Sequence, residues 1–226
     1  VDSKGYFITN YPTEEWEKWI TLLRNSDASA ELKLTSQDLS QLIYDAFMLA
    51  GAKLLPNYRV PLELINAVLP NSELFPVWNT GSSVVSSLWS YFRTSDTTGI
   101  SSLMQKTFRS FAQTLVSKKY ELVALNTSDS WLEQRFKTEV TQFACAYGLE
   151  MCILDAQVAF KRWRAGVTQL DPNVRATVVR YAIQASDDSS DWDYLWNVYT
   201  KTLVTSVKLD YLQGLAQTSD EELLKV

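Results

Sequence analysis

A helical spacing of apolar residues runs through the sequence from Thr13 onward and constrains the fold more than any other feature. In the first such segment, Trp16, Ile20 and Leu23 recur at intervals of three and four and would share one face of a helix. Capping residues before these segments and Gly or Pro after them support the same interpretation. The predicted helices begin at Thr13, at Thr35 or Ser36 (ending at Gly51) and at Pro61 (ending before Pro70), and then cover residues 78–92, 101–116, 131–147, 151–165, 172–185, 191–200, 207–217 and 221–226.

These helices are short and are joined by short polar connections, which indicates how they pack. Helices of this kind form antiparallel pairs, and such pairs stack into curved solenoids. The sequence shows no repeating period, so the prediction rests on the lengths of helices and loops. We therefore predict an all-α fold, an armadillo/HEAT-like α-solenoid of antiparallel helix pairs.

Residues 5–11 are the exception to the helical pattern. They are rich in aromatic and β-prone residues and stop at Pro12, which is typical of a strand. A lone strand needs a partner, and no second clear strand follows in the chain. We expect residues 1–12 to be the terminal strand and linker of a preceding domain, and residues 13–226 to be the helical domain.

The chain contains no histidine, which removes most forms of catalysis from consideration. Ser-His and Cys-His nucleophile pairs and histidine-containing zinc sites all require that residue. Two cysteines are too few for a Cys-rich structural zinc site. We predict no catalytic residue, no metal ligand and no cofactor in this chain. An enzyme that uses carboxylates alone is the remaining catalytic alternative.

Charge and hydropathy exclude two further classes of partner. The formal net charge is −5, without the large basic face that phosphate contacts require, so we expect no nucleic-acid partner. No apolar run reaches the roughly 18 residues needed to cross a bilayer. We therefore expect no membrane contact by this chain itself.

Cys145 and Cys152 are separated by seven positions. On one continuous helix their Cα atoms would lie about 10.5 Å apart, which is too far for a disulfide. Gly148 lies between them and is suited to end a helix in the left-handed conformation, which would bring the two residues together. The spacing alone leaves two alternatives open, a disulfide across a helix break or two buried free thiols.

Three polar stretches have both a functional and a structural interpretation. Asn126 begins an Asn-Thr-Ser sequon between two helices, and such a sequon is a glycosylation site only if the chain is extracellular or lumenal. The acidic run 187–193 lacks the glycine and glutamate of an EF-hand loop, so we expect Ser190 or Asp191 to cap the next helix. The basic residues of 161–164 suit a helix C-terminus, with an anion-binding role for one arginine as the alternative.

The segment from residue 171 to 199 resembles a known family. Its Pro-Asn-Val-Arg-Ala-Thr-Val, Tyr-Ala-Ile-Gln and Trp-Asp-Tyr-Leu-Trp-Asn-Val-Tyr runs are similar to the P-N-x-R-x-x-V…Y-x-I-Q…W-x-x-L-W-x-x-Y pattern of the C-terminal domain of M1 zinc aminopeptidases, the class of aminopeptidase N and the ER aminopeptidases. Further segments of that domain, taken in the same order along the chain, are similar to residues 5–11, 42–50, 73–78 and 143–152. Ile8, Pro12 and Tyr44 depart from the family pattern and mark a divergent member.

The resemblance implies a fold, a parent protein and a role. It implies that Cys145 and Cys152 form a disulfide and that residues 5–11 belong to a preceding β-sandwich. It also implies a chain cut from a longer protein at both ends, with zinc held in an upstream catalytic domain. The implied partners are those missing domains and peptide substrates, in an extracellular, cell-surface or secretory-lumen location.

The function implied for this chain is that of a non-catalytic domain. It would form the concave cover of the substrate chamber of a zinc metallo-aminopeptidase and gate the access of peptides. The resemblance does not say which residues bind substrate. The alternative is a helical-repeat interaction or receptor domain of a divergent, inactive homologue.

Overall fold

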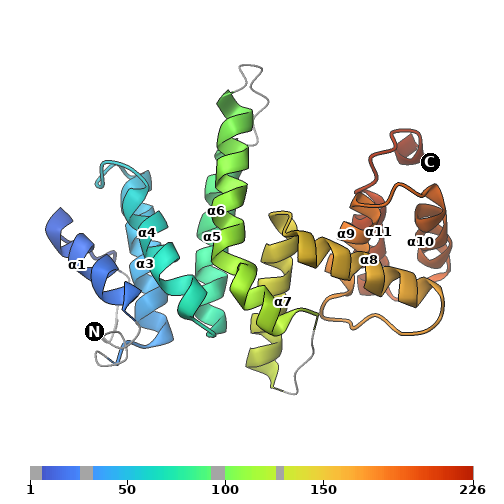
Figure 1. The fold of residues 1–226 in the computed structure, drawn as a ribbon, viewed down its shortest axis with the longest axis horizontal. Helices are drawn as coiled ribbons and strands as arrows, with labels where there is room; N and C mark the ends of the chain where they lie inside the picture. Colours follow the sequence, from blue (N-terminus) through green and yellow to red (C-terminus); the bar gives the residue numbers. More distant parts are fainter. Residues whose placement is uncertain (1–6, 26–32, 93–99, 126–129, 226) are drawn as a thin grey trace. The chain divides into compact units, whose positions relative to one another are not determined.

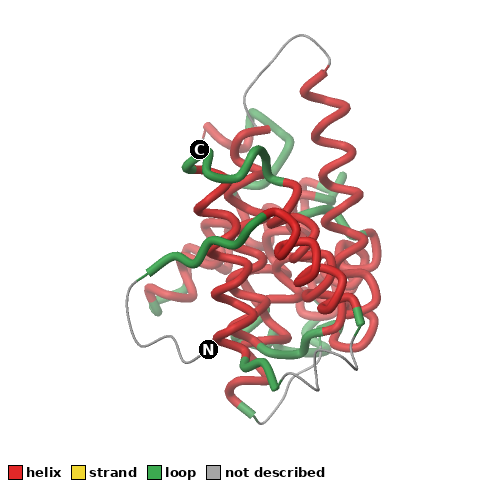
Figure 2. Tube along the Cα trace, turned by 90° about the vertical axis from the view of Figure 1, so that its left-hand side faces the viewer, coloured by secondary structure: helices red, strands yellow, loops and turns green. Residues whose placement is uncertain are grey.

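The computed structural model describes residues 7–25, 33–92, 100–125 and 130–225. The chain divides into two compact units, an N-terminal unit (Val1–Lys119) and a C-terminal unit (Tyr120–Val226). Helix α6 (Ile100–Val123) carries the chain from the first unit into the second. Within the described ranges all regular elements are helices and no strand is present, as Figure 2 shows. The prediction of an all-α fold is confirmed.

The N-terminal unit is built on a small set of helices that pack against near neighbours in the chain. They are α1 (Thr13–Arg24), α3 (Ser36–Gly51), α4 (Arg59–Val68), the 3₁₀ helix η1 (Leu69–Asn71) and α5 (Phe75–Phe92), followed by the first part of α6 (Figure 1). Helix α3 packs against α4 and α5, and α1 packs against α4. Trp16, Ile43, Leu64 and Trp78 are fully buried between them.

The C-terminal unit has the same kind of local packing. Its elements after α6 are α7 (Trp131–Ala146), α8 (Glu150–Arg164), α9 (Arg175–Gln184), α10 (Ser189–Lys201), α11 (Thr205–Leu215) and the 3₁₀ helix η2 (Leu223–Lys225). Helix α9 packs against α7, α8 and α11, and α10 packs against α11. In both units the helices that pack against one another are close in chain order, which is the packing of an α-solenoid.

Helix α3 shows how local sequence sets a helix and where our prediction needs correction. Its N-cap is Thr35, whose side chain accepts from the backbone N–H of Asp38 while the Asp38 carboxylate accepts from Thr35, a complete capping box. Gly51 is the last helical residue, but the left-handed position that follows is Lys53, at φ 60°. The Lys53 and Leu54 N–H groups bond back to carbonyls of the last turn at 3.1 and 2.9 Å.

The predicted strand over residues 5–11 is not confirmed. Residues 7–11 form no strand, and residues 5 and 6 lie outside the described part of the chain. The backbone N–H of Thr9 donates instead to a carboxylate oxygen of Asp45 on α3, at 2.8 Å. The Tyr11 ring packs edge-on against Trp16, with 4.9 Å between ring centroids. Contacts with helices α1 and α3 replace the pairing with a neighbouring strand.

Several helix bounds also differ from the prediction. Pro61 is the third residue of α4, not its first, and α5 begins at Phe75. Helix α6 continues to Val123, beyond the predicted end at residue 116. It continues because Lys119 and Tyr120 are buried: the Lys119 ammonium lies 3.3 Å from Glu73, and the Tyr120 hydroxyl donates to Asp155 at 2.8 Å. The predicted helix over 221–226 reduces to η2.

Candidate functional site

The described ranges contain no group of three or more His, Cys, Asp or Glu residues that could hold a metal ion. No single described helix is long and apolar enough to cross a membrane, and α7 and α8 pass that test only as a pair bent by 107°. The functional features of the chain are therefore its cavities and the polar groups that line them.

One cavity of the C-terminal unit has a volume of about 680 Å³. Helices α8 and α9 and the connection into α10 line it, with Gln157, Phe160, Lys161, Arg164, Ala165, Ala182, Ala185, Ser186, Asp187, Asp188 and Asp191. Cations from the last turn of α8 thus face carboxylates at the start of α10. This cavity brings together the basic stretch and the acidic run that the sequence singled out.

An internal ion pair occupies the centre of this charged arrangement. Arg164 donates to one carboxylate oxygen of Asp191, and the Ser186 hydroxyl donates to the other at 2.8 Å. Asp191 is 5 % exposed, whereas the Arg164 side chain is 35 % exposed, so the carboxylate is shielded from water and the guanidinium is partly hydrated. The Arg164 guanidinium also lies 5.9 Å from the centre of the Tyr194 ring. Arg164 therefore joins α8 to α10, and the carboxylate that it contacts belongs to this chain.

Helix α10 is capped by Asp188, and the prediction of Ser190 or Asp191 was wrong. One Asp188 oxygen accepts from the Ser190 backbone N–H at 2.9 Å, and the other accepts from the Ser190 hydroxyl at 2.6 Å. These bonds hold the pKa of Asp188 below its ordinary 3.8, the side-chain bond from Ser190 being the largest cause. Asp191 is not free to cap the helix because Arg164 and Ser186 use both of its oxygens.

The residues that carry the family resemblance hold the helices of the C-terminal unit together. Arg175 begins α9, and its Nε donates to a carboxylate oxygen of Asp210 on α11 at 2.9 Å. Trp192 on α10 is buried and donates its indole N–H to the Leu215 carbonyl at 3.0 Å. Both contacts join neighbouring helices around the core of this unit. These motif residues thus hold neighbouring helices together.

Cys145 and Cys152 lie on either side of the predicted helix break. Gly148 has φ 73°, and its N–H and that of Leu149 bond back to carbonyls of α7 at 3.0 and 2.9 Å. The two sulfur atoms lie 2.08 Å apart and the two Cα atoms 5.2 Å apart, and both residues are buried. This corner joins α7 to α8. The sequon residue Asn126 lies outside the described residues.

The sequence analysis did not predict one buried polar contact. Asp45 on α3 is 2 % exposed, and its carboxylate accepts from the Thr9 backbone and from the side-chain amide of Gln41. The signal for it was a charged residue within the apolar run of residues 42–50. A carboxylate in that position needs hydrogen-bond donors, and the segment before α1 supplies one of them.

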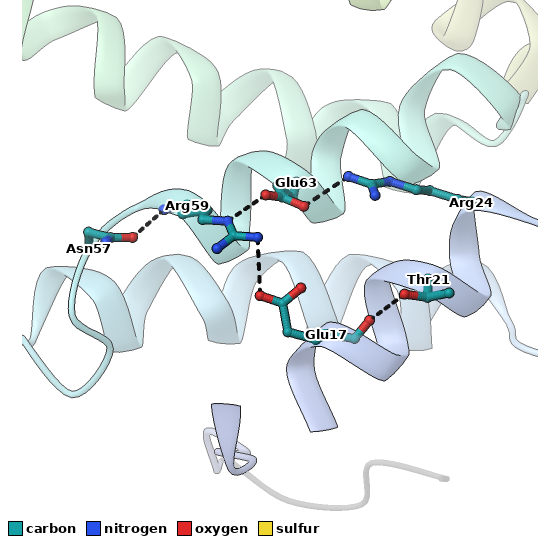
Figure 3. A network of polar contacts seen from close by, with 6 residues as sticks. All are labelled: Glu17, Thr21, Arg24, Asn57, Arg59 and Glu63. Atoms are coloured by element: carbon teal, nitrogen blue, oxygen red, sulfur yellow. Dashed lines mark hydrogen bonds and ion pairs between the residues drawn. The ribbon is translucent and has the colours of Figure 1, made fainter. Parts of the chain in front are cut away.

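A second polar network lies on the surface of the N-terminal unit and joins α1 to α4 (Figure 3). Glu63 accepts from Arg24 at 2.8 Å and from Arg59 at 2.6 Å, and Arg59 also reaches Glu17 at 3.3 Å. The hydrogen bond from Arg59 is the largest cause that lowers the pKa of Glu63. The charges of these side chains alternate in sign and balance one another. Because the ion pairs connect α1 with α4, the network positions these two helices.

The fold and these features together define a class. In each unit the described helices pack against near neighbours in the chain, and the described ranges contain no metal-binding cluster. This is the class of all-α helical domains. The profile of the ERAP1-like C-terminal domain family matches residues 1–226, and the chain belongs to that family, the C-terminal domain of M1-family aminopeptidases.

Known relatives agree with this family. Glutamyl aminopeptidase of Rattus norvegicus is 30 % identical over 223 residues, which cover 99 % of this chain and 22 % of that protein. Glutamyl aminopeptidase of Homo sapiens is 28 % identical with the same coverage. Aminopeptidase N of Bos taurus is 28 % identical over 207 residues, 87 % of this chain and 20 % of that protein. The chain thus spans about a fifth of the length of the curated relatives it matches.

Proposed function

We propose that this chain is the non-catalytic domain of a zinc aminopeptidase, covers the substrate chamber of that enzyme and gates the access of peptides. The observation that carries the proposal is the family match over residues 1–226, in proteins named as aminopeptidases of which the chain spans about 22 %. The remaining length of such a protein would hold the zinc and the reacting groups. The location that goes with this role is extracellular or in the secretory pathway.

The arrangement of helices supports such a role. A stack of helix pairs presents one end or face of each pair to a bound chain, and together these form a continuous wall. In the cavity of about 680 Å³, Arg164 and Ser186 contact Asp191, which is consistent with a wall that offers shape and binding and not proton transfer. Binding of this kind stabilises a long peptide equally in the enzyme–substrate complex and in the transition state. The wall also controls the entry of the peptide.

The test compares the full-length aminopeptidase with a variant that lacks this domain. We expect kcat/KM for a peptide of about ten residues to fall much further than kcat/KM for an aminoacyl anilide, which carries one residue and needs no distal wall. Zinc content and the unfolding transition of the remaining domains are the controls for folding. Equal losses for both substrates in a folded, zinc-loaded variant would refute the gating role.

The same measurement separates the alternative function. A full-length protein that binds no zinc and does not cleave the anilide would support an interaction or receptor domain. A protein that binds zinc and cleaves both substrates supports the chamber role.

A further inference from the structure

We draw no further inference here: the strongest candidate, the cavity of about 680 Å³ lined by α8, α9 and the connection into α10, carries none, because its buried carboxylate Asp191 is already held by Arg164 and Ser186, its other charged side chains are exposed and of both signs, and nothing in the structure shows which ligand it would take.

Discussion

The two units of this chain are held together by different kinds of polar contact. In the N-terminal unit, the network around Arg59 lies on the surface, where Arg59 and Glu17 are 62 % and 43 % exposed. In the C-terminal unit, the pair between Arg175 and Asp210 is much less exposed, at 16 % and 24 %. The Cys145–Cys152 corner belongs to the C-terminal unit alone, whereas a buried indole bond occurs in both units.

The two ion pairs differ in what their loss should cost. Exposed ion pairs contribute little to stability, so the residues that form them can be exchanged at small cost. A half-buried pair leaves an unbalanced charge when one partner is removed, so its residues are exchanged at a large cost. Arg175 belongs to one of the segments that resemble the family. The contrast between the units can be tested at four levels.

The largest effect is expected from two matched tryptophans, one in each unit. Trp78 and Trp192 are both buried, and both donate their indole N–H to a backbone carbonyl at 3.0 Å. Replacing either by Ala should lower the free energy of unfolding of its own unit by about 3–5 kcal/mol. Residue-resolved amide exchange reports this loss for each unit separately.

The exposed Trp131 provides the control for this pair. Trp131→Ala should change the stability by no more than about 0.5 kcal/mol, because its ring is 69 % exposed. Faster exchange in both units after Trp78→Ala alone would show that the two units unfold as one.

The next effect is confined to the C-terminal unit, which holds both cysteines. Replacing Cys145 and Cys152 by Ser should lower its free energy of unfolding by about 2.5 kcal/mol, the value expected for closing so short a loop. Denaturant unfolding with and without a reducing agent measures the loss. Thiol titration of the unfolded, unreduced protein should find no free sulfhydryl, and two free thiols would contradict the disulfide.

A smaller effect is expected at the left-handed residue that follows a helix. Each unit has such a residue, but the residue type differs. The left-handed residue after α3 is Lys53, at φ 60°, whereas that after α8 is Gly166, at φ 72°. Lys53→Gly should stabilise the N-terminal unit by about 1 kcal/mol, and Gly166→Ala should destabilise the C-terminal unit by about the same amount. A Cβ at Gly166 would meet no atom within 4 Å, so that substitution measures backbone strain alone.

Chemical denaturation of both variants checks these two values. Destabilisation by Lys53→Gly would mean that contacts of the lysine side chain outweigh the strain of its backbone.

The smallest effect is a pH dependence of the N-terminal unit. The pKa of Glu63 is lowered in the folded state, mainly by its hydrogen bond from Arg59. A lowered pKa stabilises the fold above the ordinary value of 4.5, and this contribution is lost as the pH falls through the folded-state pKa. Unfolding midpoints measured from pH 7 to about pH 3 should therefore fall less steeply for Glu63→Gln than for the wild type.

The wild type in high salt is the control, because screening should make it resemble the variant. An identical pH profile for both proteins at low salt would show that Glu63 contributes nothing to stability.

The sequence predicted the helices well because most of them bury one face, and that spacing is local. It predicted the break at Gly148 for the same reason, since the signal is a single glycine between two apolar runs. The end of α6 could not be predicted, because the buried Lys119 contacts Glu73, which is 46 positions away. Contacts between distant parts of a chain leave little trace in a window of a few residues.

The candidate sites show the same limit. The acidic run before α10 identified a helix start, but the choice of Asp188 as the cap depends on Arg164, which takes the carboxylate of Asp191. The strand prediction failed because β-prone residues indicate an extended chain without naming its partner, and the partner is Asp45. The sequence showed which segments are polar or aromatic, but which residues contact one another could be seen only in the folded chain.

The hydrogen bond between Thr9 and Asp45 also has a mechanical consequence. It joins positions 36 apart, so residue 9 is attached to α3 by this bond as well as to α1 through the chain. A pull or a twist applied to residue 7 is therefore divided between two helices that both pack against α4. The segment therefore has two points of attachment to the N-terminal unit, the chain itself at Pro12 and the hydrogen bond from Thr9 to Asp45.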